Sequence, residues 1–215
     1  MNVGYYMTKN PVVVSPEISV PEARALMRRE KIHRLPVQDK AGKLIGIVTA
    51  SDLSHASAAP TTSLDMYELH YLISKLTVAT VMTKNVVTIT EDLPIEEAAR
   101  IMADSDISGL PVMRGNILIG IITESDIFRL FISLFGARHA GVRLTVLMPE
   151  KRGELAAVSG AIAKAGGNIV SLATFDGEDP TNHYCTMKVG GLERKALVDV
   201  VSPLVERIVD VREKI

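Results

Sequence analysis

The feature that most constrains the fold of this chain is an internal repeat. The segment Tyr6–Asn10 recurs as Val81–Asn85, and Leu35–Val37 recurs as Leu110–Val112. Both pairs of segments are 75 residues apart along the chain (81 − 6 and 110 − 35). Because self-similarity at a fixed spacing marks a structural unit that is made more than once, we expect two copies of one fold that pack together.

Each copy contains a glycine that leads into an apolar strand, a threonine at the end of that strand, and an aspartate soon after it. These residues are Gly46, Thr49 and Asp52 in the first copy, and Gly120, Thr123 and Asp126 in the second. The glycine lets a backbone come close. The hydroxyl can donate to a phosphate or ribose oxygen, and the carboxylate can accept from ribose hydroxyls. The following helix N-terminus offers N–H groups to an anion. This order favours a ligand site; the alternative is that Thr and Asp only cap the helix.

The rest of each copy follows one order of elements. Apolar residues at helical spacing predict a helix over 20–27 and another over 95–102. The second helix is expected to be entered at Glu91 or Asp92, with Pro94 in its first turn. A short strand, a turn, the glycine-led strand and a further helix complete each copy.

The segments around the second copy have their own patterns. Composition predicts a surface loop over 54–63, and apolar spacing predicts a linker helix over 65–76. The helix expected over 127–135 is apolar on nearly every face, and such helices are normally buried all round. Since one domain supplies only one burying face, we predict that this helix packs across a homodimer contact.

A different pattern begins after the glycine-bounded linker Gly136–Gly141. Strands are expected over 142–147, 168–175, 184–189 and 208–211, and helices over 155–165 and 194–205. The resulting order βαββαβ predicts a ferredoxin-like unit. The chain as a whole is therefore expected to be of the α/β (α+β) class.

Composition excludes several classes of function. The net charge of −1 gives no general attraction to nucleic acid or membrane, and no apolar run is long enough for a membrane span. The N-terminus has no leader pattern, and the lone Cys185 fits a reducing cytoplasm and a buried core position. No histidine pair has metal-ligand spacing, and no phosphate-loop or nucleophile motif is present. Asp52 and Asp126 belong to equivalent copies, which indicates two binding sites rather than one catalytic acid and one base.

Residues 1–135 resemble a tandem pair of cystathionine-beta-synthase (CBS) domains. The motifs that carry the resemblance are Met7-Thr8, His33–Val37 and Gly46–Asp52, with their second copies. The resemblance implies a disc-like module with two nucleotide-sized clefts between the repeats. It also implies an adenine nucleotide or related adenosyl compound (AMP, ADP, ATP, NAD or S-adenosylmethionine) as a regulatory ligand, with no catalytic cofactor.

The same resemblance implies which residues meet the ligand. The expected ribose and phosphate contacts are Thr49, Asp52, Thr123, Asp126, His33 and Arg34. The expected base-side contacts are Thr8, Thr83, Ile32, Ile107 and Ser108. The first copy has His33-Arg34 where the second has Ser108-Gly109. We therefore expect unequal clefts, with Arg34 binding a phosphate.

Residues 140–215 resemble an ACT domain, a small module that often senses amino acids. The resemblance rests on Gly153-x-Leu155 and on Gly166–Ile169, and it makes Gly153, Asn168 and Ile169 candidate ligand contacts. Many ACT domains have Asp-x-Pro-Gly before the helix, whereas this chain has Glu150–Gly153. We therefore expect no tight amino-acid binding and a use in dimerisation.

These patterns predict a first CBS repeat at 1–60, a linker helix at 61–80, a second repeat at 81–136 and an ACT-like domain at 140–215. The arrangement resembles the family of the acetoin-utilisation accessory protein B. We interpret the chain as a cytoplasmic, homodimeric sensor that regulates a partner enzyme, without nucleic acid or membrane. The alternatives are an amino-acid sensor with structural repeats and an oligomerisation scaffold with empty clefts.

Overall fold

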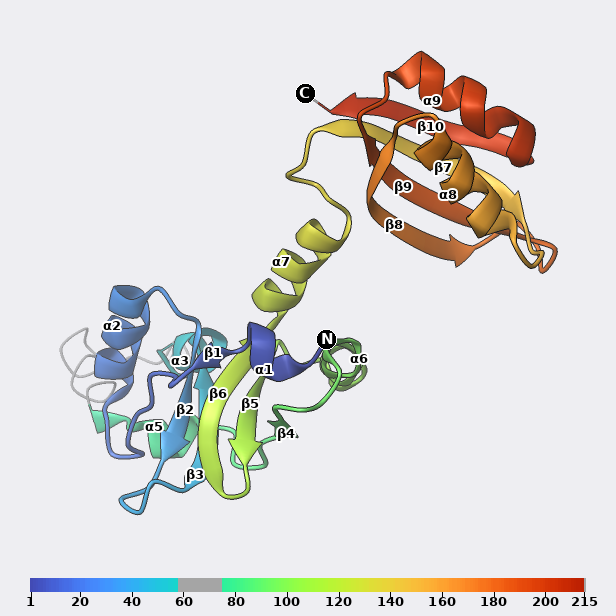
Figure 1. Cartoon of the computed structure of the whole chain (residues 1–215). Coiled ribbons are helices and arrows are strands. Elements are labelled where there is room, and N and C mark those ends of the chain that lie inside the picture. Colours follow the sequence, from blue (N-terminus) through green and yellow to red (C-terminus); the bar gives the residue numbers. More distant parts are fainter. Residues whose placement is uncertain (58–74, 215) are drawn as a thin grey trace. The chain divides into compact units, whose positions relative to one another are not determined.

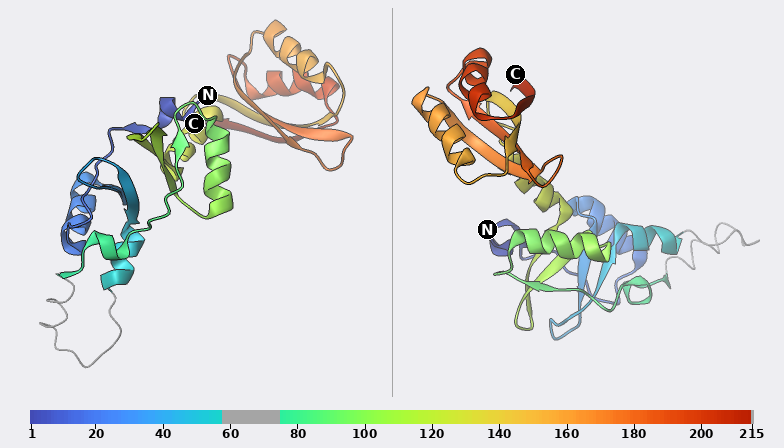
Figure 2. Two further views of the ribbon diagram at one scale, coloured as in Figure 1. Left: turned by 90° about the horizontal axis from the view of Figure 1, so that it is seen from below. Right: turned by 90° about the vertical axis from the view of Figure 1, so that its right-hand side faces the viewer.

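The computed structural model describes residues 1–57 and 75–214, in two compact units. Unit 1 comprises Met1–Ile127 and unit 2 comprises Phe128–Ile215. Figure 1 shows the elements of both units, and Figure 2 gives two further views of each. The helix predicted over 65–76 lies outside the described residues except at its last two positions. We describe each unit by itself.

The first repeat has the helix, two strands and second helix that the sequence predicts, preceded by a short helix and a short strand that it did not predict. Its elements are α1 (Val3–Tyr6), β1 (Thr8–Lys9), α2 (Val20–Glu30), β2 (Arg34–Gln38), β3 (Leu44–Thr49) and α3 (Ala50–Ser57). Ser19 and Glu22 form a capping box at the start of α2, where Ser19 Oγ accepts from the Glu22 amide. The loop predicted from residue 54 is wrong over 54–57, because α3 continues to Ser57.

The second repeat has the same order of elements. It comprises α5 (Val78–Val81), β4 (Ile89–Thr90), α6 (Ile95–Ser105), β5 (Gly109–Arg114), β6 (Ile117–Thr123) and α7 (Glu124–Leu134). The predicted entry to α6 is right for Pro94, which is the N-cap, and wrong for Glu91 and Asp92, because no side chain caps the helix. Glu91 instead forms an ion pair with Arg114. The Thr90 hydroxyl donates a hydrogen bond to the Asp92 carboxylate, which lowers the pKa of Asp92.

The two repeats exchange their Met-Thr segments. Strand β1 of the first repeat joins the sheet of the second, in the order β1-β6-β5-β4, with Thr8 opposite Ile121. Thr83 of the second repeat forms a bridge with Ile47 of the first, through two backbone hydrogen bonds of 2.9 and 3.0 Å. Each repeat therefore completes the other, and unit 1 is one module.

The glycines of the glycine-led strands make room for this exchange. A Cβ on Gly46 would lie 2.5 Å from Met82 Sδ, and a Cβ on Gly120 would lie 2.4 Å from Met7 Sδ. Both distances are too short for a real contact. The expectation that these glycines admit a ligand is therefore replaced by a packing role.

Unit 2 has the expected ferredoxin-like order. Strands β7 (Gly141–Pro149), β8 (Asn168–Asp176), β9 (Asn182–Gly190) and β10 (Arg207–Lys214) alternate with helices α8 (Glu154–Lys164) and α9 (Arg194–Val201). The antiparallel sheet has the order β10-β7-β9-β8, and both helices cover one face (Figures 1 and 2). The second helix is shorter than predicted, because Ser202–Leu204 form a 3-10 turn that contains Pro203.

The core of unit 2 lies between the helices and the sheet. It is formed by alternate residues of the central strands, such as Leu144 and Met187, and by the inner faces of both helices. Cys185 belongs to this core and is fully buried, as predicted. The resulting layers confirm the α/β (α+β) class with a C-terminal ferredoxin-like domain.

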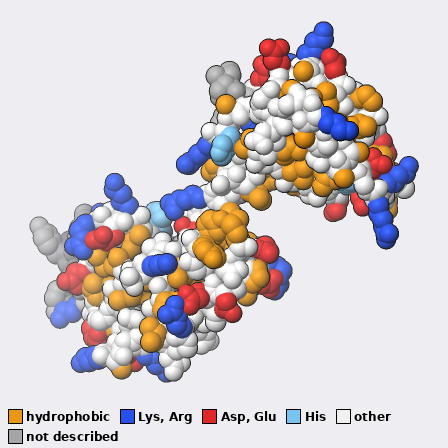
Figure 3. Space-filling model, in the orientation of Figure 1, with side chains coloured by type: hydrophobic (Ala, Val, Ile, Leu, Met, Phe, Trp, Pro, Cys, Tyr) orange, Lys and Arg blue, Asp and Glu red, His pale blue; other side chains and the backbone are white. Residues whose placement is uncertain are grey.

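The surface is mixed in charge. Figure 3 shows acidic and basic side chains interspersed over the visible face, with no large area of one sign. This distribution agrees with the net charge of −1. Among residues 1–57 and 75–214, no helix is long and apolar enough to cross a membrane, and no group of His, Cys, Asp and Glu side chains is arranged to hold a metal.

Candidate functional site

A cavity of about 260 Å³ lies within unit 1 and is lined by both repeats. We call it the Thr49 cleft. It is lined by five of the residues that the sequence predicts as ligand contacts: Arg34, Thr49, Thr83, Ile107 and Ser108. The exchange of Met-Thr segments brings these residues together, because the backbone bridge between Thr83 and Ile47 holds Thr83 beside β3 of the first repeat. Residues from opposite ends of the repeat thereby meet in one cavity.

Thr49 and Asp52 are bonded to each other at the end of β3. The backbone N–H and the hydroxyl of Thr49 both donate to Asp52 Oδ2, at 2.8 Å each. The Asp52 N–H donates to the Thr49 hydroxyl at 3.2 Å. This is the helix-capping geometry that the sequence left open as an alternative. A capping role and a ligand role are compatible, because the hydrogen bonds between the two residues use only one carboxylate oxygen of Asp52.

The second copy repeats this arrangement. Thr123 donates to Asp126 Oδ2 from its backbone N–H at 2.9 Å and from its hydroxyl at 2.8 Å. Asp126 is buried, with 6% of its surface exposed. Thr8, opposite Ile121, lies on the strand next to β6. Thr8, Thr123 and Asp126 are thus the equivalents, in the other repeat, of Thr83, Thr49 and Asp52. Of these three, Thr83 and Thr49 line the Thr49 cleft and Asp52 does not.

Arg34 links the two repeats. Its Nη2 donates to the Ser108 hydroxyl at 2.9 Å, while its Nη1 is buried and has no hydrogen-bond partner in the described part of the chain. Burial lowers the pKa of the Arg34 guanidinium, and the nearby carboxylates of Glu124 and Asp126 partly offset this effect. A buried donor without a partner is costly, and an oxyanion in the cleft would satisfy it.

Gly109 makes the position of Arg34 possible. A Cβ at Gly109 would lie 1.8 Å from Arg34 Nη1, so only a glycine leaves room for the guanidinium. The sequence shows Gly109 as the equivalent of Arg34 in the second repeat. The pair therefore acts as one unit, in which one repeat supplies the arginine and the other supplies the space for it.

Several residues of the Thr49 cleft were not predicted: Ile47, Asn85, Val86, Val87, Asp106 and Gly109. The signal for Asn85 was present, because it belongs to the repeated Met-Thr-Lys-Asn segment. Asp106 was harder to find, because its equivalent in the first repeat is Lys31, which has the opposite charge.

Ile32 and His33 do not line the Thr49 cleft. They line a second cavity of unit 1, beside α2. Both residues precede β2, which begins at Arg34. The sequence grouped His33 with Arg34 as phosphate contacts, and the structure gives them separate cavities.

The three candidate contacts of the ACT-like unit lie at opposite ends of α8. Gly153 is the N-cap residue, in the left-handed region with φ 93°. Asn168 and Ile169 begin β8 after the helix has ended. The 11 residues of α8 correspond to about 16 Å at 1.5 Å per residue, so these residues do not converge on one small ligand within a single chain.

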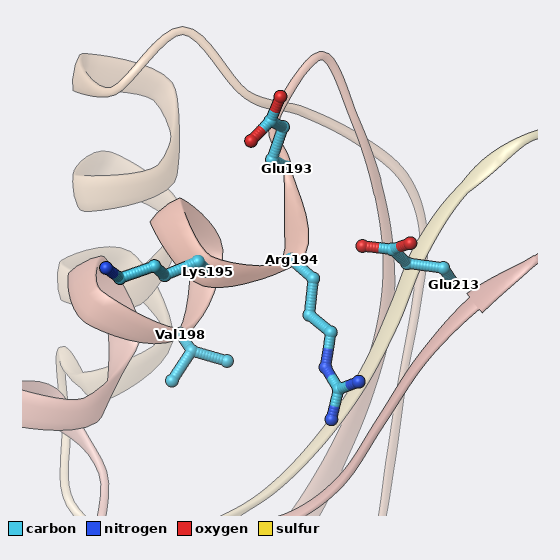
Figure 4. A pocket seen from close by; sticks show the side chains of 5 residues that line it. All are labelled: Glu193, Arg194, Lys195, Val198 and Glu213. Carbon is cyan, nitrogen blue, oxygen red and sulfur yellow. The ribbon is translucent and has the colours of Figure 1, made fainter.

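Unit 2 also has an open pocket of about 680 Å³ at the start of α9. Figure 4 shows its lining, in which Glu193 and Arg194 point in opposite directions and Glu213 belongs to β10. Glu193, Arg194 and Glu213 are all exposed. Acidic and basic side chains that point apart do not converge on one ligand, so the Thr49 cleft is the stronger candidate.

Comparison with protein families identifies both parts of the chain. The CBS domain matches residues 3–59 and 78–133, and the TTHA0829-like ACT domain matches residues 140–212. The two CBS matches together cover more than half of the chain. They correspond to the two copies of the repeat, and the ACT match corresponds to the ferredoxin-like fold of unit 2.

Solved structures of CBS pairs are similar to this chain. The CBS domain pair of protein MJ0100, in complex with 5′-methylthioadenosine and S-adenosyl-L-methionine, is 33% identical with a TM-score of 0.53, covering 65% of this chain and 98% of that one. CBSX2 in complex with AMP is 33% identical with a TM-score of 0.50, over 61% and 96%. An acetoin utilization protein (AcuB) of Vibrio cholerae is 28% identical with a TM-score of 0.54, over 64% and 95%.

Curated relatives include enzymes that contain a similar segment. The L-aspartate semialdehyde sulfurtransferase of Methanocaldococcus jannaschii is 35% identical over 126 residues, which are 58% of this chain and 22% of that protein. The chain thus spans under a quarter of the length of that relative. CBS and ACT domains are themselves regulatory and non-catalytic families. The chain belongs to the CBS-domain proteins, as a tandem CBS pair followed by a TTHA0829-like ACT domain.

Proposed function

We propose that this chain is a non-catalytic regulatory protein that binds adenosyl ligands in the clefts between its CBS repeats. The observation that carries the proposal is the Thr49 cleft, where Thr49 and Arg34 of one repeat line a cavity with Thr83 and Ser108 of the other. A ligand there would contact both repeats at once. Two similar CBS pairs were solved with adenosyl compounds in complex, which supports this ligand class.

We assign the residues as follows. Asp52 accepts from ribose hydroxyls through the carboxylate oxygen that does not cap α3. Arg34 Nη1, buried without a partner, donates to a phosphate oxygen. Thr83 and the Ile107-Ser108 segment flank the base.

Thr123, Asp126 and Thr8 perform the equivalent roles in the second cleft. The second repeat has Gly109 in place of Arg34, which makes the two clefts unequal.

Binding would become regulation only if the ligand favours one arrangement of the protein over another. We propose that the ACT-like unit or a partner enzyme receives this change, in a cytoplasmic homodimer. The exposed apolar side chains Phe128, Phe131 and Leu134 of α7, which are 66%, 55% and 51% exposed, support a contact between two copies.

A thermal-shift panel tests the proposal. Adenosine, AMP, ATP, NAD, S-adenosylmethionine and 5′-methylthioadenosine are each added, together with the amino acids as a separate series. A ligand of the native state raises the melting temperature. We expect shifts from adenosyl compounds and none from amino acids. Shifts from amino acids alone would favour the amino-acid sensor, and no shift at all would favour a scaffold with empty clefts.

The variants must separate ligand binding from capping, because Asp52 does both in this proposal. Asp52→Asn keeps a capping acceptor and removes the negative charge, whereas Asp52→Ala removes both. We expect both variants to weaken adenosine binding and only the alanine variant to lower the melting temperature without ligand. Unchanged adenosine binding in the double variant Asp52→Ala with Asp126→Ala would refute the proposal.

A further inference from the structure

The second cavity of unit 1 has an unusual concentration of positive charge. It has a volume of about 560 Å³ and lies beside α2 and the start of α3. Four of the residues that line it are Arg24, Arg28, Lys31 and His33, and no acidic residue of the described chain lines it. We call this cavity the α2 pocket.

The helical spacing of the cations explains how they come to share one wall. Positions 24 and 28 are four residues apart and therefore lie on one face of α2. Lys31 is the C-cap residue, just beyond the helix, and lines the same cavity. Met27, which is 4% exposed, lies on the same face and forms an apolar floor. Like charges at this spacing repel one another, so the arrangement has a cost for the folded protein.

That cost is not offset by ion pairs. Arg24 donates a hydrogen bond to the Ser54 hydroxyl at 3.3 Å. In the part of the chain that the structure describes, neither Arg28 nor Lys31 is joined to a carboxylate in an ion pair. By contrast, Arg29 on the same helix pairs with Glu30 at 2.8 Å and lies outside the pocket. The pocket therefore holds cations whose charge is available to a ligand.

The second repeat shows that the fold does not require these basic residues. The equivalents of Arg24, Arg28, Lys31 and His33 are Ala99, Ala103, Asp106 and Ser108. Lys31 and Asp106 even share one backbone conformation, with φ of 54° and 52°. The buried positions are unchanged, since Ala23 and Met27 correspond to Ala98 and Met102. None of the four equivalent positions has a basic residue, which separates the α2 pocket from the structural needs of a CBS repeat.

The α2 pocket is also distinct from the Thr49 cleft. The adjoining ends of β2 and β3 lie between the two cavities, and there the Ala50 N–H donates to the His33 carbonyl at 2.8 Å. His33 and Ala50 line the pocket, whereas their chain neighbours Arg34 and Thr49 line the cleft. The ends of the two strands thus separate one site from the other.

We propose that the α2 pocket is a second ligand site, which binds a phosphate-bearing anion with at least two negative charges. Guanidinium groups match phosphate oxygens with paired hydrogen bonds, and the cavity is wide enough for more than one phosphate group. The site does not depend on adenosyl binding in the Thr49 cleft. Its ligand is either a free anion such as pyrophosphate or the phosphate chain of a nucleotide.

Calorimetric titration with pyrophosphate tests the site directly. Arg24→Ala and Arg28→Ala reproduce residues that the second repeat already has, so we expect both variants to fold. Each lost charge-assisted contact should weaken pyrophosphate binding by about tenfold or more, and Lys31→Asp should weaken it further. Arg29→Ala is the matched control, because it removes the same charge from the same last turn of α2. Arg28 and Arg29 are equally placed to interact with the helix dipole, and Arg29 differs in its ion pair with Glu30 and in lying outside the pocket.

Competition identifies the source of the phosphate. If the ligand is a free anion, saturating ATP leaves pyrophosphate binding unchanged; if it is a nucleotide's phosphate chain, ATP competes and AMP does not. Adenosine affinity should be the same in wild type and Arg24→Ala/Arg28→Ala, which separates this site from the Thr49 cleft. The proposal is overturned if wild type does not bind millimolar pyrophosphate, if the double variant binds it as well as wild type, or if Arg29→Ala weakens binding equally.

Discussion

Arg34 of the first repeat donates a hydrogen bond to Ser108 of the second across 2.9 Å, while its other terminal nitrogen is buried without a partner. This places one satisfied and one unsatisfied donor of a single guanidinium beside the same cleft. A planar group that is fixed at one end is pre-organised for an anion at the other. The arrangement explains why one repeat has an arginine and the other a glycine at equivalent positions.

The first prediction is that Arg34→Ala weakens AMP binding far more than adenosine binding. Losing one charge-assisted contact to the phosphate should reduce AMP affinity by roughly ten- to a hundredfold. Arg34→Lys keeps the positive charge but not the paired N–H donors of the guanidinium, and should give an intermediate loss of AMP affinity. Calorimetry with both ligands measures the difference. Equal losses for AMP and adenosine would mean that the arginine is structural.

The second prediction concerns the exchange of segments between repeats. Gly46→Ala places a methyl group against Met82 and the Thr83 carbonyl, 3.1 Å from that oxygen. Overpacking of this kind should lower the free energy of unfolding by about 1–3 kcal/mol. Urea denaturation gives the free energy of unfolding of wild type, Gly46→Ala, Met82→Ala and the double variant, which together form a double-mutant cycle. We expect Met82→Ala to cost less in the alanine background than alone; fully additive losses would show that the two residues do not interact.

Much of this fold could be predicted because its determinants are local and repeated. Thr49 and Asp52 have the same spacing as Thr123 and Asp126, and both pairs cap a helix at the end of a strand. The alternating strands of unit 2 likewise give the ferredoxin-like order directly. Such patterns depend on neighbours in the chain, which a sequence displays.

The parts that could not be predicted depend on contacts between distant residues. Nothing near Met82 shows that its side chain packs on Gly46, or that Thr83 joins the sheet of the other repeat. The α2 pocket was not predicted, because the sequence alone does not show that Arg24, Arg28 and His33 line one cavity. Gly109 is a similar case, because its role appears only when Arg34 lies over it.

The third prediction follows from the burial of Cys185. Its side chain is fully buried, and desolvation raises the pKa of the thiol from its ordinary value of 9.0 to about 11. The native thiol should therefore resist thiol-specific reagents at pH 8, and it should react once urea unfolds the chain. Because the folded pKa lies above the unfolded one, this group's contribution to stability is lost as the pH rises from about 9 to about 11. Rapid labelling of the native protein would show that unit 2 opens in solution.

The last prediction concerns the part of α7 from residue 127 onward, which the sequence predicts to be apolar on nearly every face. From Phe128 onward the helix belongs to unit 2. There Phe131 packs on Phe135 at 4.5 Å, and Phe135 stacks on Phe175 of β8 at 6.0 Å between ring centroids. Phe128 and Leu134 remain exposed, at 66% and 51%.

Exposed apolar side chains of this size favour contact with a partner surface, and a second copy of the chain is the partner we expect. Phe128→Asp with Leu134→Asp should therefore convert a dimer into a monomer without unfolding unit 2, since neither residue belongs to the aromatic contacts of Phe135. Leu155→Asp, at a position on α8 that is 40% exposed, is the matched control and should leave the dimer intact. Sedimentation equilibrium measures the mass of each variant. A monomeric wild type, or a double variant that keeps the dimer mass, would show that α7 does not make a homodimer contact.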